Sequence, residues 1–356
     1  MSNSTAQPDP KHADPTAERA DRMKRLSIIP IWNTSGVAEE MGYKARGHVW
    51  RWRDLHAEFE EAVKTSLAGP GTERRILLFE NPGMPRSAAA TPTLNGALQM
   101  ILPGEVAPAH RHTYSALRFI LSGSGAFTVV DGTRADMHEL DLLLTPGGCW
   151  HSHAHNGGTE PMVWFDALDT PFVSYMRADC FEMHPSKSLE PYTNTVGSYE
   201  DIGALGMLQG RTRAQPPASP QLVYKWAAAE AMIQAGLDRD DDDPYEGVVY
   251  EYVNPITGGH VMPTIACHVN GFRKGFHSKA RRRTSSSLCV VAKGSGATII
   301  DGVKHEWSER DVIAEPAWSW CEYIAYEKSI LFRTSDQPIL EPFGLARQED
   351  HPNGRQ

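Results

Sequence analysis

The chain has 356 residues and a formal net charge of −9, with 40% hydrophobic and 22% charged residues. This composition is typical of a globular protein with enough chain for two cores of ordinary domain size. The acidic balance argues against a nucleic-acid-binding surface, although local arginines could still bind a small anionic substrate. No apolar run reaches membrane-spanning length, and the N-terminus lacks the apolar core of a signal peptide.

The five cysteines are odd in number and none has the CxxC spacing: Cys149, Cys180, Cys267, Cys289 and Cys321. This pattern indicates reduced thiols in a reducing compartment rather than a disulfide framework. We therefore expect a cytoplasmic protein with neither a membrane nor a nucleic acid as its partner.

The first part of the chain contains a polar tail, one helix and then strands. Residues 1–25 are rich in Pro, Asp, Ser and Lys, which predicts disorder. Asp54 is predicted to cap a helix, and a strand is predicted over residues 73–79. The apolar stripe of this helix would contain Leu55, Phe59, Ala62 and Val63. From residue 91 to 173, short apolar segments alternate with Gly, Pro and Asp turns, which is typical of an antiparallel sandwich or barrel.

Residues 174–245 have a different composition, in which Pro, Ser and Gly recur. One helix is predicted there, capped by Ser219, with Pro220 in its first turn and Gly236 at its end. Its apolar stripe would contain Leu222, Trp226, Ala229 and Ile233. The acidic run 240–243 is predicted to be a solvated loop. The predicted division is a disordered tail (1–25), an N-terminal domain (26–175), a connector with one helix (176–245) and a C-terminal domain (246–356).

Two histidine groups are the strongest candidates for chemistry. His110 and His112 are two residues apart, so on a strand both imidazoles point to the same face. His151 follows a predicted strand and could supply a third imidazole to a metal. For a single His-x-His motif, ordinary polar residues at a strand edge remain an alternative. His138 and His155 are expected at the surface, where single histidines commonly lie.

An internal repeat favours the metal site. Residues 123–132 (GSGAFTVVDG) return as residues 294–302 (GSGATIIDG), which indicates a duplicated β domain. When the two copies are aligned on this repeat, all three histidines are replaced: His110 by Arg281, His112 by Arg283 and His151 by Cys321. Residues that serve only the fold should be kept in both copies. We therefore predict one metal site, in the first copy, and a structural second copy.

Longer segments resemble a known family. Residues 104–112 and 146–151 resemble the two motifs of the cupin superfamily, and residues 108–119, 150–153, 164–169 and 252–264 resemble the gentisate 1,2-dioxygenase family. That family includes salicylate, 5-nitrosalicylate and 1-hydroxy-2-naphthoate dioxygenases, and the resemblance runs from about residue 28 to 347. It implies an all-β bicupin fold with a few helices, built from two antiparallel jelly-roll β-barrels.

The resemblance also implies an activity and a cofactor. We expect Fe(II), O₂ and cleavage of the aromatic ring of a 2-hydroxybenzoate between its carboxyl- and hydroxyl-bearing carbons, in a homo-oligomer that is usually a tetramer. Many cupin sites add a glutamate about five positions after the second histidine, but residues 116–118 contain none. Three histidines leave three cis positions on an octahedral iron, enough for a chelating hydroxy acid and O₂.

Several further residues are candidates for the site. Arg118 lies six residues after His112, and its planar fork suits a carboxylate or bound oxygen; the alternative is a buried Arg paired with an acidic neighbour. His153 could exchange protons with substrate or only hydrogen-bond to neighbouring groups. Arg74 matches a substrate-facing family position, with a surface charge as the alternative. Gln99 matches a site-facing polar position, and Asp166 is a supporting candidate.

Two departures from the family pattern concern the substrate. Many relatives have Trp-Ala or Trp-Gly where this chain has Asn95-Gly96, and Gln where it has Tyr114. If Asn95 lines the pocket, its small amide opens room for a polar substituent, which favours gentisate, 5-nitrosalicylate or another 5-substituted salicylate. Two alternatives remain: a cupin isomerase or other metalloenzyme with a different metal, and a non-catalytic bicupin for binding or storage.

Overall fold

The computed structural model describes residues 22–23, 25, 45–65, 75–186, 189, 194–195, 218–240 and 242–356. The sheets and helices named below belong to a compact unit of residues 44–356. The predicted disordered tail, residues 1–25, lies outside the described residues apart from Arg22, Met23 and Arg25. Within the described part of the chain, no helix is both long and apolar enough to cross a membrane.

Two six-stranded sheets form the N-terminal half. The first has the order β13 (Val223–Tyr224), β8 (Leu142–Thr145), β5 (Ala116–Ser122), β10 (Met162–Leu168), β3 (Asn95–Ile101) and β2 (Arg75–Leu78). The second has the order β11 (Phe181–Met183), β4 (Val106–His112), β9 (His151–His155), β6 (Ala126–Val130), β7 (Thr133–Asp136) and β12 (Asn194–Thr195). Apolar side chains from both sheets, such as Ile120 and Ala126, pack into one buried cluster between them.

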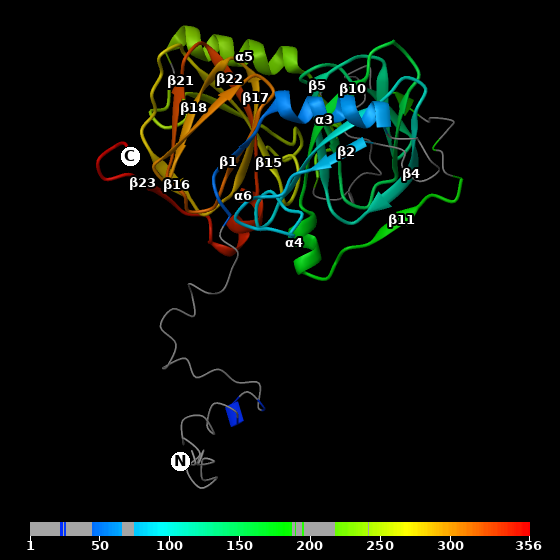
Figure 1. Ribbon diagram of the computed structural model, residues 1–356, viewed down its shortest axis with the longest axis horizontal. Helices are drawn as coiled ribbons and strands as arrows, with labels where there is room; N and C mark the ends of the chain where they lie inside the picture. The colour runs from blue at the N-terminus through cyan, green and yellow to red at the C-terminus, as the bar shows by residue number, and fades with distance from the viewer. Residues whose placement is uncertain are drawn as a thin grey trace, which may run out of the picture. The chain divides into compact units, whose positions relative to one another are not determined.

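The C-terminal half repeats this arrangement. Its first sheet has the order β1 (His48–Trp50), β20 (Val312–Glu315), β17 (Ser287–Lys293), β22 (Ser329–Ser335), β15 (Ala266–Phe272) and β14 (Val248–Tyr252). Its second has the order β19 (Val303–Ser308), β18 (Ser295–Ile300), β21 (Cys321–Ala325), β16 (Arg281–Arg283) and β23 (Gln348–Asp350). Figure 1 shows the two halves side by side. The predicted bicupin fold is confirmed.

The repeat predicted from sequence is visible in the strand register. His110 on β4 is paired with His151 on β9, and Arg281 on β16 is paired with Cys321 on β21, as the sequence alignment requires. The Asp-Gly pairs at 131–132 and 301–302 form equivalent turns in which both residues have positive φ. Such φ values suit Asp-Gly in a two-residue hairpin loop, so the same local sequence forms the same turn twice.

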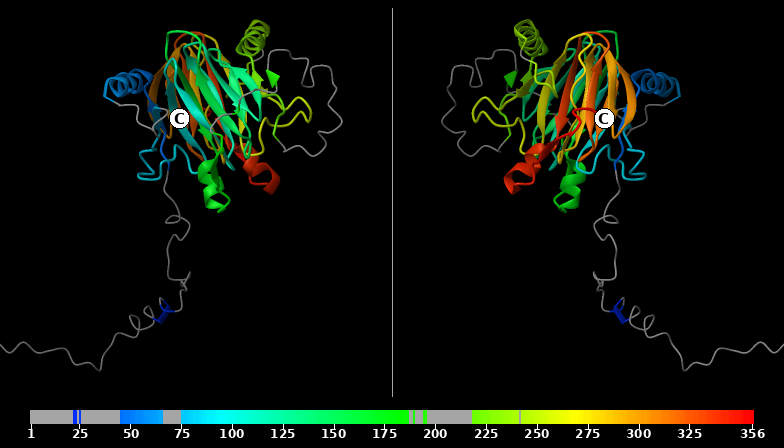
Figure 2. Two further views of the ribbon diagram at one scale, coloured as in Figure 1. Left: turned by 90° about the vertical axis from the view of Figure 1, so that its right-hand side faces the viewer. Right: turned by 90° about the vertical axis from the view of Figure 1, so that its left-hand side faces the viewer.

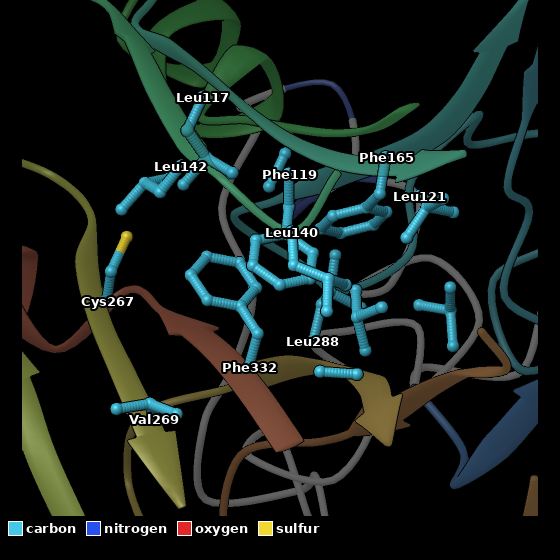
Figure 3. Close-up of a cluster of buried hydrophobic side chains, with 14 of the residues drawn as sticks. Leu117, Phe119, Leu121, Leu140, Leu142, Phe165, Cys267, Val269, Leu288 and Phe332 are labelled. Atoms are coloured by element: carbon cyan, nitrogen blue, oxygen red, sulfur yellow. The ribbon is translucent and has the colours of Figure 1, made fainter. Parts of the chain in front are cut away.

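The two halves share their largest hydrophobic core. Alternate residues of β5 and β22 point away from their own barrel and pack against the other half. Phe119 and Phe332 stack across this junction, with ring centroids 4.2 Å apart and an interplanar angle of 4°. Figure 3 shows both rings between the strands of the two halves, with Leu117, Leu142 and Leu288 around them. Strands buried on both faces explain why β5 is an almost continuous apolar run.

Each half also contributes an arm to the other. The first arm is β1 followed by helix α3 (Trp52–Thr65), and its strand pairs with β20 of the C-terminal half. The second arm is β13 followed by helix α5 (Trp226–Arg239), and its strand pairs with β8 of the N-terminal half. The predicted connector therefore supplies strands to the N-terminal sheets, and its boundaries at 175 and 245 stay predictions.

The predicted starts of both arm helices are wrong. Helix α3 begins at Trp52, so Asp54 lies in its first turn, and the Trp52 backbone N–H donates to Asp311 at 2.8 Å. Helix α5 begins at Trp226, whose N–H donates to Asp141 at 2.8 Å. A carboxylate from the barrel therefore takes the place of a local capping side chain.

The residues expected to delimit α5 have other roles. Ser219 binds the Tyr224 hydroxyl at 2.7 Å, before the helix begins. Gly236 lies inside α5, which ends at Arg239 with Asp240 in the left-handed region at φ 65°. Of the acidic run, Asp240 and Asp242 form ion pairs with Arg273; the Asp240 side chain is 87% exposed, as expected for a solvated loop, whereas that of Asp242 is 23% exposed.

Two short helices follow the last large strand of each half. Helix α4 (Thr170–Tyr175) follows β10, and helix α6 (Gln337–Leu340) follows β22 and continues into the 3₁₀ helix η3 (Glu341–Phe343). Figures 1 and 2 show α4 in green and α6 in red at the same end of the two halves. Two polar contacts between the halves lie at this end, from Thr264 to Asp169 and from Thr93 to Asp336.

Candidate metal centre

Three histidines meet inside the N-terminal barrel. His110 and His112 come from β4 and His151 from the neighbouring β9, and one ring nitrogen of each lies within 4.8 Å of the others. The ring centroids are 4.3 Å apart for His110 and His151, 4.7 Å for His112 and His151, and 5.8 Å for His110 and His112. All three side chains are buried. This triad is the one such cluster of His, Cys, Asp or Glu found among the described residues.

The backbone fixes the orientation of each ring. The Nδ1 atom of His110 lies 2.8 Å from the Pro108 carbonyl oxygen, and that of His112 lies 2.7 Å from the carbonyl oxygen of Tyr114. His151 Nδ1 lies 3.1 Å from the carbonyl oxygen of Cys149. A carbonyl can only accept, so each Nδ1 carries a proton, and a neutral ring then has its lone pair on Nε2, in the plane of the ring. This is the tautomer that binds a metal through Nε2, and the donor set fits a divalent transition ion.

The electrostatic surroundings keep His151 neutral. Burial, then the positive charge of Arg118 and then the neighbouring His110 and His112, hold the pKa of His151 well below its usual range. A neutral imidazole is the form that can coordinate a metal. Near neutral pH the site therefore does not need to lose a proton from His151 before it binds an ion.

Arg118 anchors a polar network beside the triad. It lies on β5, is buried, and donates to the Thr145 hydroxyl and to Nε2 of His153, the latter at 3.0 Å. Its Nε lies 3.7 Å from a carboxylate oxygen of Asp166, the residue paired with it on β10. Arg118 is therefore buried beside an acidic neighbour, as the alternative prediction stated. Because arginine has no acceptor, this contact places the proton of a neutral His153 on Nδ1.

Gln99 and Asn95 line the same face of β3. The side-chain amide of Gln99 donates to Asp166, which also accepts the Trp164 indole N–H at 3.0 Å. Asn95 lies four residues before Gln99, so strand alternation points both side chains to the same side. The side-chain oxygens of Asn95 and Gln99 are buried without a hydrogen-bond partner among the described residues. Two acceptors therefore remain for a ligand or water at this face.

The predictions for His138, His155 and Arg74 are met to different degrees. His138 is exposed, as expected. The expectation for His155 was wrong, because this residue is completely buried and its Nε2 lies 2.8 Å from the carbonyl oxygen of Glu160. As the last residue of β9 it keeps the inward facing of His151 and His153. Arg74 lies outside the described residues, which resume at Arg75.

The equivalent region of the C-terminal barrel contains a salt-bridge cluster. Glu246 accepts from Arg283 and Arg333, and its carboxylate lies 4.0 Å from Arg281. Burial alone would raise the pKa of Glu246, but Arg333 and Arg283 lower it to about 2. At the positions of His110, His112 and His151, this half therefore has the charged side chains of Arg281 and Arg283 and the Cys321 thiol in place of three imidazoles.

Some site residues could not be found from sequence. Phe181 on β11 stacks on the His110 ring with centroids 5.2 Å apart, although β11 lies about seventy residues further along the chain. Thr145 contacts Arg118 from β8, and the carbonyl of Tyr114 holds His112. Pairing of an edge strand and the position of a turn carbonyl leave no pattern of side chains in the sequence. Strand alternation could have predicted only that the Thr145 side chain points into the barrel.

The chain is similar to a family model and to several proteins of known activity. The family described as Cupin domain matches residues 97–168, which include the triad. The chain is 32% identical over 353 residues to 5-aminosalicylate 1,2-dioxygenase from Comamonas sp., covering 96% of this chain and 92% of the relative. It is 37% identical over 310 residues to 1-hydroxy-2-naphthoate 1,2-dioxygenase from Nocardioides sp. (strain KP7), covering 84% and 78%.

A solved structure is as similar to this chain as the first of these relatives. The crystal structure of salicylate 1,2-dioxygenase from Pseudoaminobacter salicylatoxidans in an adduct with gentisate matches with a TM-score of 0.87 and 32% identity. The match covers 97% of this chain and 96% of that one. The similarity therefore extends over both halves and both arms, beyond the segment that contains the triad.

Proposed function

Because the chain belongs to the gentisate 1,2-dioxygenase family of ring-cleaving enzymes, we propose that it uses Fe(II) and O₂ to cleave a 2-hydroxybenzoate. The bond broken would join the carboxyl-bearing and hydroxyl-bearing ring carbons. The observation that carries this proposal is the buried triad whose three Nδ1 atoms all face backbone carbonyls. Such an arrangement preorganises three neutral nitrogen ligands for one ion.

In the proposed mechanism His110, His112 and His151 hold the iron. When bound, Fe(II) supplies the redox and Lewis-acid chemistry that lets O₂ react with an aromatic hydroxy acid. The absence of a carboxylate from the triad matters for the charge of the site. Three neutral ligands leave the full positive charge of the ion to attract an anionic substrate, whereas a glutamate would cancel part of it.

Arg118 is proposed to bind and orient the substrate carboxylate or oxygen. It is a buried cation close enough to the triad to affect His151, and Thr145, Asp166 and His153 hold its guanidinium in place. A guanidinium fixed in this way presents charge without reorganisation when the ring reacts. The contact between Arg118 and His153 Nε2 supports a positioning role for His153, which is one of its two predicted roles.

Gln99, Asn95 and Arg74 complete the proposed substrate pocket. Gln99 and Asn95 offer buried amide oxygens from one face of β3, and Arg74 remains a proposal from the family resemblance. We infer that Asn95 accommodates a polar group at ring position 5. Two ligands named for the relatives have such a group at position 5: an amino group in 5-aminosalicylate and a hydroxyl group in gentisate. Gentisate and 5-nitrosalicylate are therefore the leading substrates proposed for this chain.

Neither alternative function is favoured by these relatives, because the proteins reported above are ring-cleaving dioxygenases. A homotetrameric assembly and a cytoplasmic location stay proposals from the resemblance and the composition. The five cysteines are all free thiols, which is consistent with a reducing compartment.

Oxygen uptake tests the proposal. Metal-free protein would be loaded with Fe(II) and supplied with gentisate, salicylate, 5-nitrosalicylate, 5-chlorosalicylate or 1-hydroxy-2-naphthoate. We expect uptake with 2-hydroxybenzoates, fastest with a polar 5-substituent, and expect Fe(II) but not Zn(II) to restore it. Equal rates with salicylate and all 5-substituted analogues would remove the role of Asn95. Full activity with Zn(II) would contradict the proposed cofactor.

A further inference from the structure

A side chain of the C-terminal half reaches the strand ends of the N-terminal barrel. The hydroxyl of Thr264, just before β15, donates to the carboxylate of Asp169, just after β10. The other oxygen of this carboxylate accepts the Ser115 backbone N–H at 2.7 Å. Asp169 also begins helix α4, yet its side chain makes no capping hydrogen bond there. Its carboxylate is instead committed to the contact between the halves, here named the Asp169 clasp.

The Asp169 clasp holds the turn that orients His112, and this turn also contacts the turn before His151. Ser115 follows Tyr114, whose carbonyl oxygen accepts from His112 Nδ1 at 2.7 Å. The Ser115 hydroxyl also lies 3.4 Å from the backbone nitrogen of Gly147, in the turn that precedes His151. In that turn, the Gly148 N–H donates to the carbonyl oxygen of His112 at 2.7 Å. Three hydrogen bonds, joined through the carboxylate of Asp169 and the peptide group between Tyr114 and Ser115, therefore connect Thr264 to the ring of His112.

The molecule contains a matched clasp that leads to no metal ligand. Thr93 of the N-terminal half donates to the carboxylate of Asp336, whose other oxygen accepts the Ser286 backbone N–H at 2.7 Å. Here the Ser286 hydroxyl lies 3.2 Å from the backbone nitrogen of Ala317. The residue three positions before Ser286 is Arg283, which occupies the position of His112. This contact is named the Asp336 clasp.

The two clasps are equally buried and occupy equivalent places in the fold. Asp169 is 2% exposed and Asp336 is 3% exposed. Each lies at the start of one of the two short helices, α4 and α6, which Figures 1 and 2 show at the same end of the halves. Loss of either threonine hydroxyl leaves a buried carboxylate oxygen short of one donor, so the cost to folding should be similar.

We propose that Thr264 is a positioning residue for the metal centre: through Asp169 and Ser115, the second barrel, which lacks the triad, holds His112 in its ligating orientation. This inference rests on the proposed function, since it requires the triad to bind iron. It gives the C-terminal half a role in the site that its own residues Arg281, Arg283 and Cys321 do not have. Groups that orient a metal-binding histidine commonly affect metal affinity about tenfold or more.

The test compares Thr264→Val with Thr93→Val in the full-length protein. For each metal-free variant, the Fe(II) dissociation constant would be measured anaerobically by competition with a chelator, together with the melting temperature. Both variants should lose a similar few degrees of thermal stability, about what one buried hydrogen bond contributes. Only Thr264→Val should weaken Fe(II) binding, by about tenfold, and Thr264→Ser should restore it.

Equal weakening in the two valine variants, or no weakening in Thr264→Val, would overturn the inference. If either valine variant does not fold, Asp169→Asn and Asp336→Asn form a second matched pair with the same expectation. The outcome is separable from that of the proposed function. Wild-type protein that binds Fe(II) no better than His110→Ala would overturn both, whereas tight wild-type binding with unaffected variants overturns the clasp alone.

Discussion

His260 lies between two carboxylates and shows how a single residue couples pH to stability. Its Nδ1 is 2.5 Å from Glu251 and its Nε2 is 2.8 Å from Glu341. The hydrogen bond to Glu251, together with Glu341 and against the opposing effect of burial, raises the pKa of His260 to about 9. The other titratable group at this position is His268, whose Nε2 lies 3.9 Å from Glu251. His260 belongs to the family-like segment 252–264, which also contains Thr264.

A raised histidine pKa predicts a defined pH dependence. The stabilisation should be complete below the ordinary pKa of 6.5 and should be lost as the pH rises through about 9. Wild-type protein should therefore exceed His260→Gln in free energy of unfolding by on the order of 1 to 2 kcal/mol near pH 6, with little difference near pH 10. Urea unfolding at both pH values measures this difference, and the exposed His138→Gln is the control. A gap that grows with pH would contradict the assignment.

At the same scale, residue spacing predicted the triad but not its support. Strand alternation placed His110 and His112 on one face, and their replacement by Arg281 and Arg283 in the second copy marked them as candidate metal ligands. The roles of the Tyr114 carbonyl and the Asp169 carboxylate could not be predicted from the sequence. Every residue has a backbone carbonyl, and an Asp before a helix normally caps that helix.

Helix α5 shows how packing overrides local preference at the scale of an element. A Cβ atom at Gly236 would lie 2.4 Å from Val248 Cγ1 and 3.0 Å from the Tyr250 hydroxyl. Glycine costs a helix about 1 kcal/mol relative to alanine, so intrinsic preference alone predicts that Gly236→Ala is stabilising. The close approach of α5 to β14 predicts the opposite.

We expect Gly236→Ala to destabilise the protein by about 1 to 2 kcal/mol, because overpacking at the sheet exceeds the gain in helix preference. Thermal unfolding of this variant beside Ala231→Gly, at an exposed interior position of the same helix, separates the two effects. The Ala231→Gly change should cost about 1 kcal/mol through helix preference alone. A higher melting temperature for Gly236→Ala would show that the helix has room to move.

Both arm helices also mark where prediction from sequence ended. The stripe containing Trp226, Ala229 and Ile233 identified α5, but its start was placed too early because Ser219 and Pro220 form a typical helix N-terminus. The amide of Trp226 instead binds Asp141 on the barrel, and Val223 before it joins a strand. A cap supplied from another part of the chain is a tertiary contact, which local sequence does not encode.

At the scale of the molecule, two similar barrels have different residues at equivalent positions, the histidine triad in one and Arg281, Arg283 and Cys321 in the other. They share the core around Phe119 and Phe332, exchange the strands β1 and β13, and exchange the clasps at Asp169 and Asp336. The repeated sequence predicted two copies of one fold. It did not predict the exchanged arms, because swapped and unswapped pairings bury the same apolar residues.

We propose that iron binds in one barrel only, at His110, His112 and His151. Iron content per chain, measured after Fe(II) loading and removal of excess metal, tests it most directly. Wild-type protein and Cys321→Ser, changed at the position equivalent to His151, should each retain about one iron per chain and consume O₂ with gentisate. His110→Ala should retain almost none and show no uptake. Iron retained by His110→Ala, or lost from Cys321→Ser, would contradict the account.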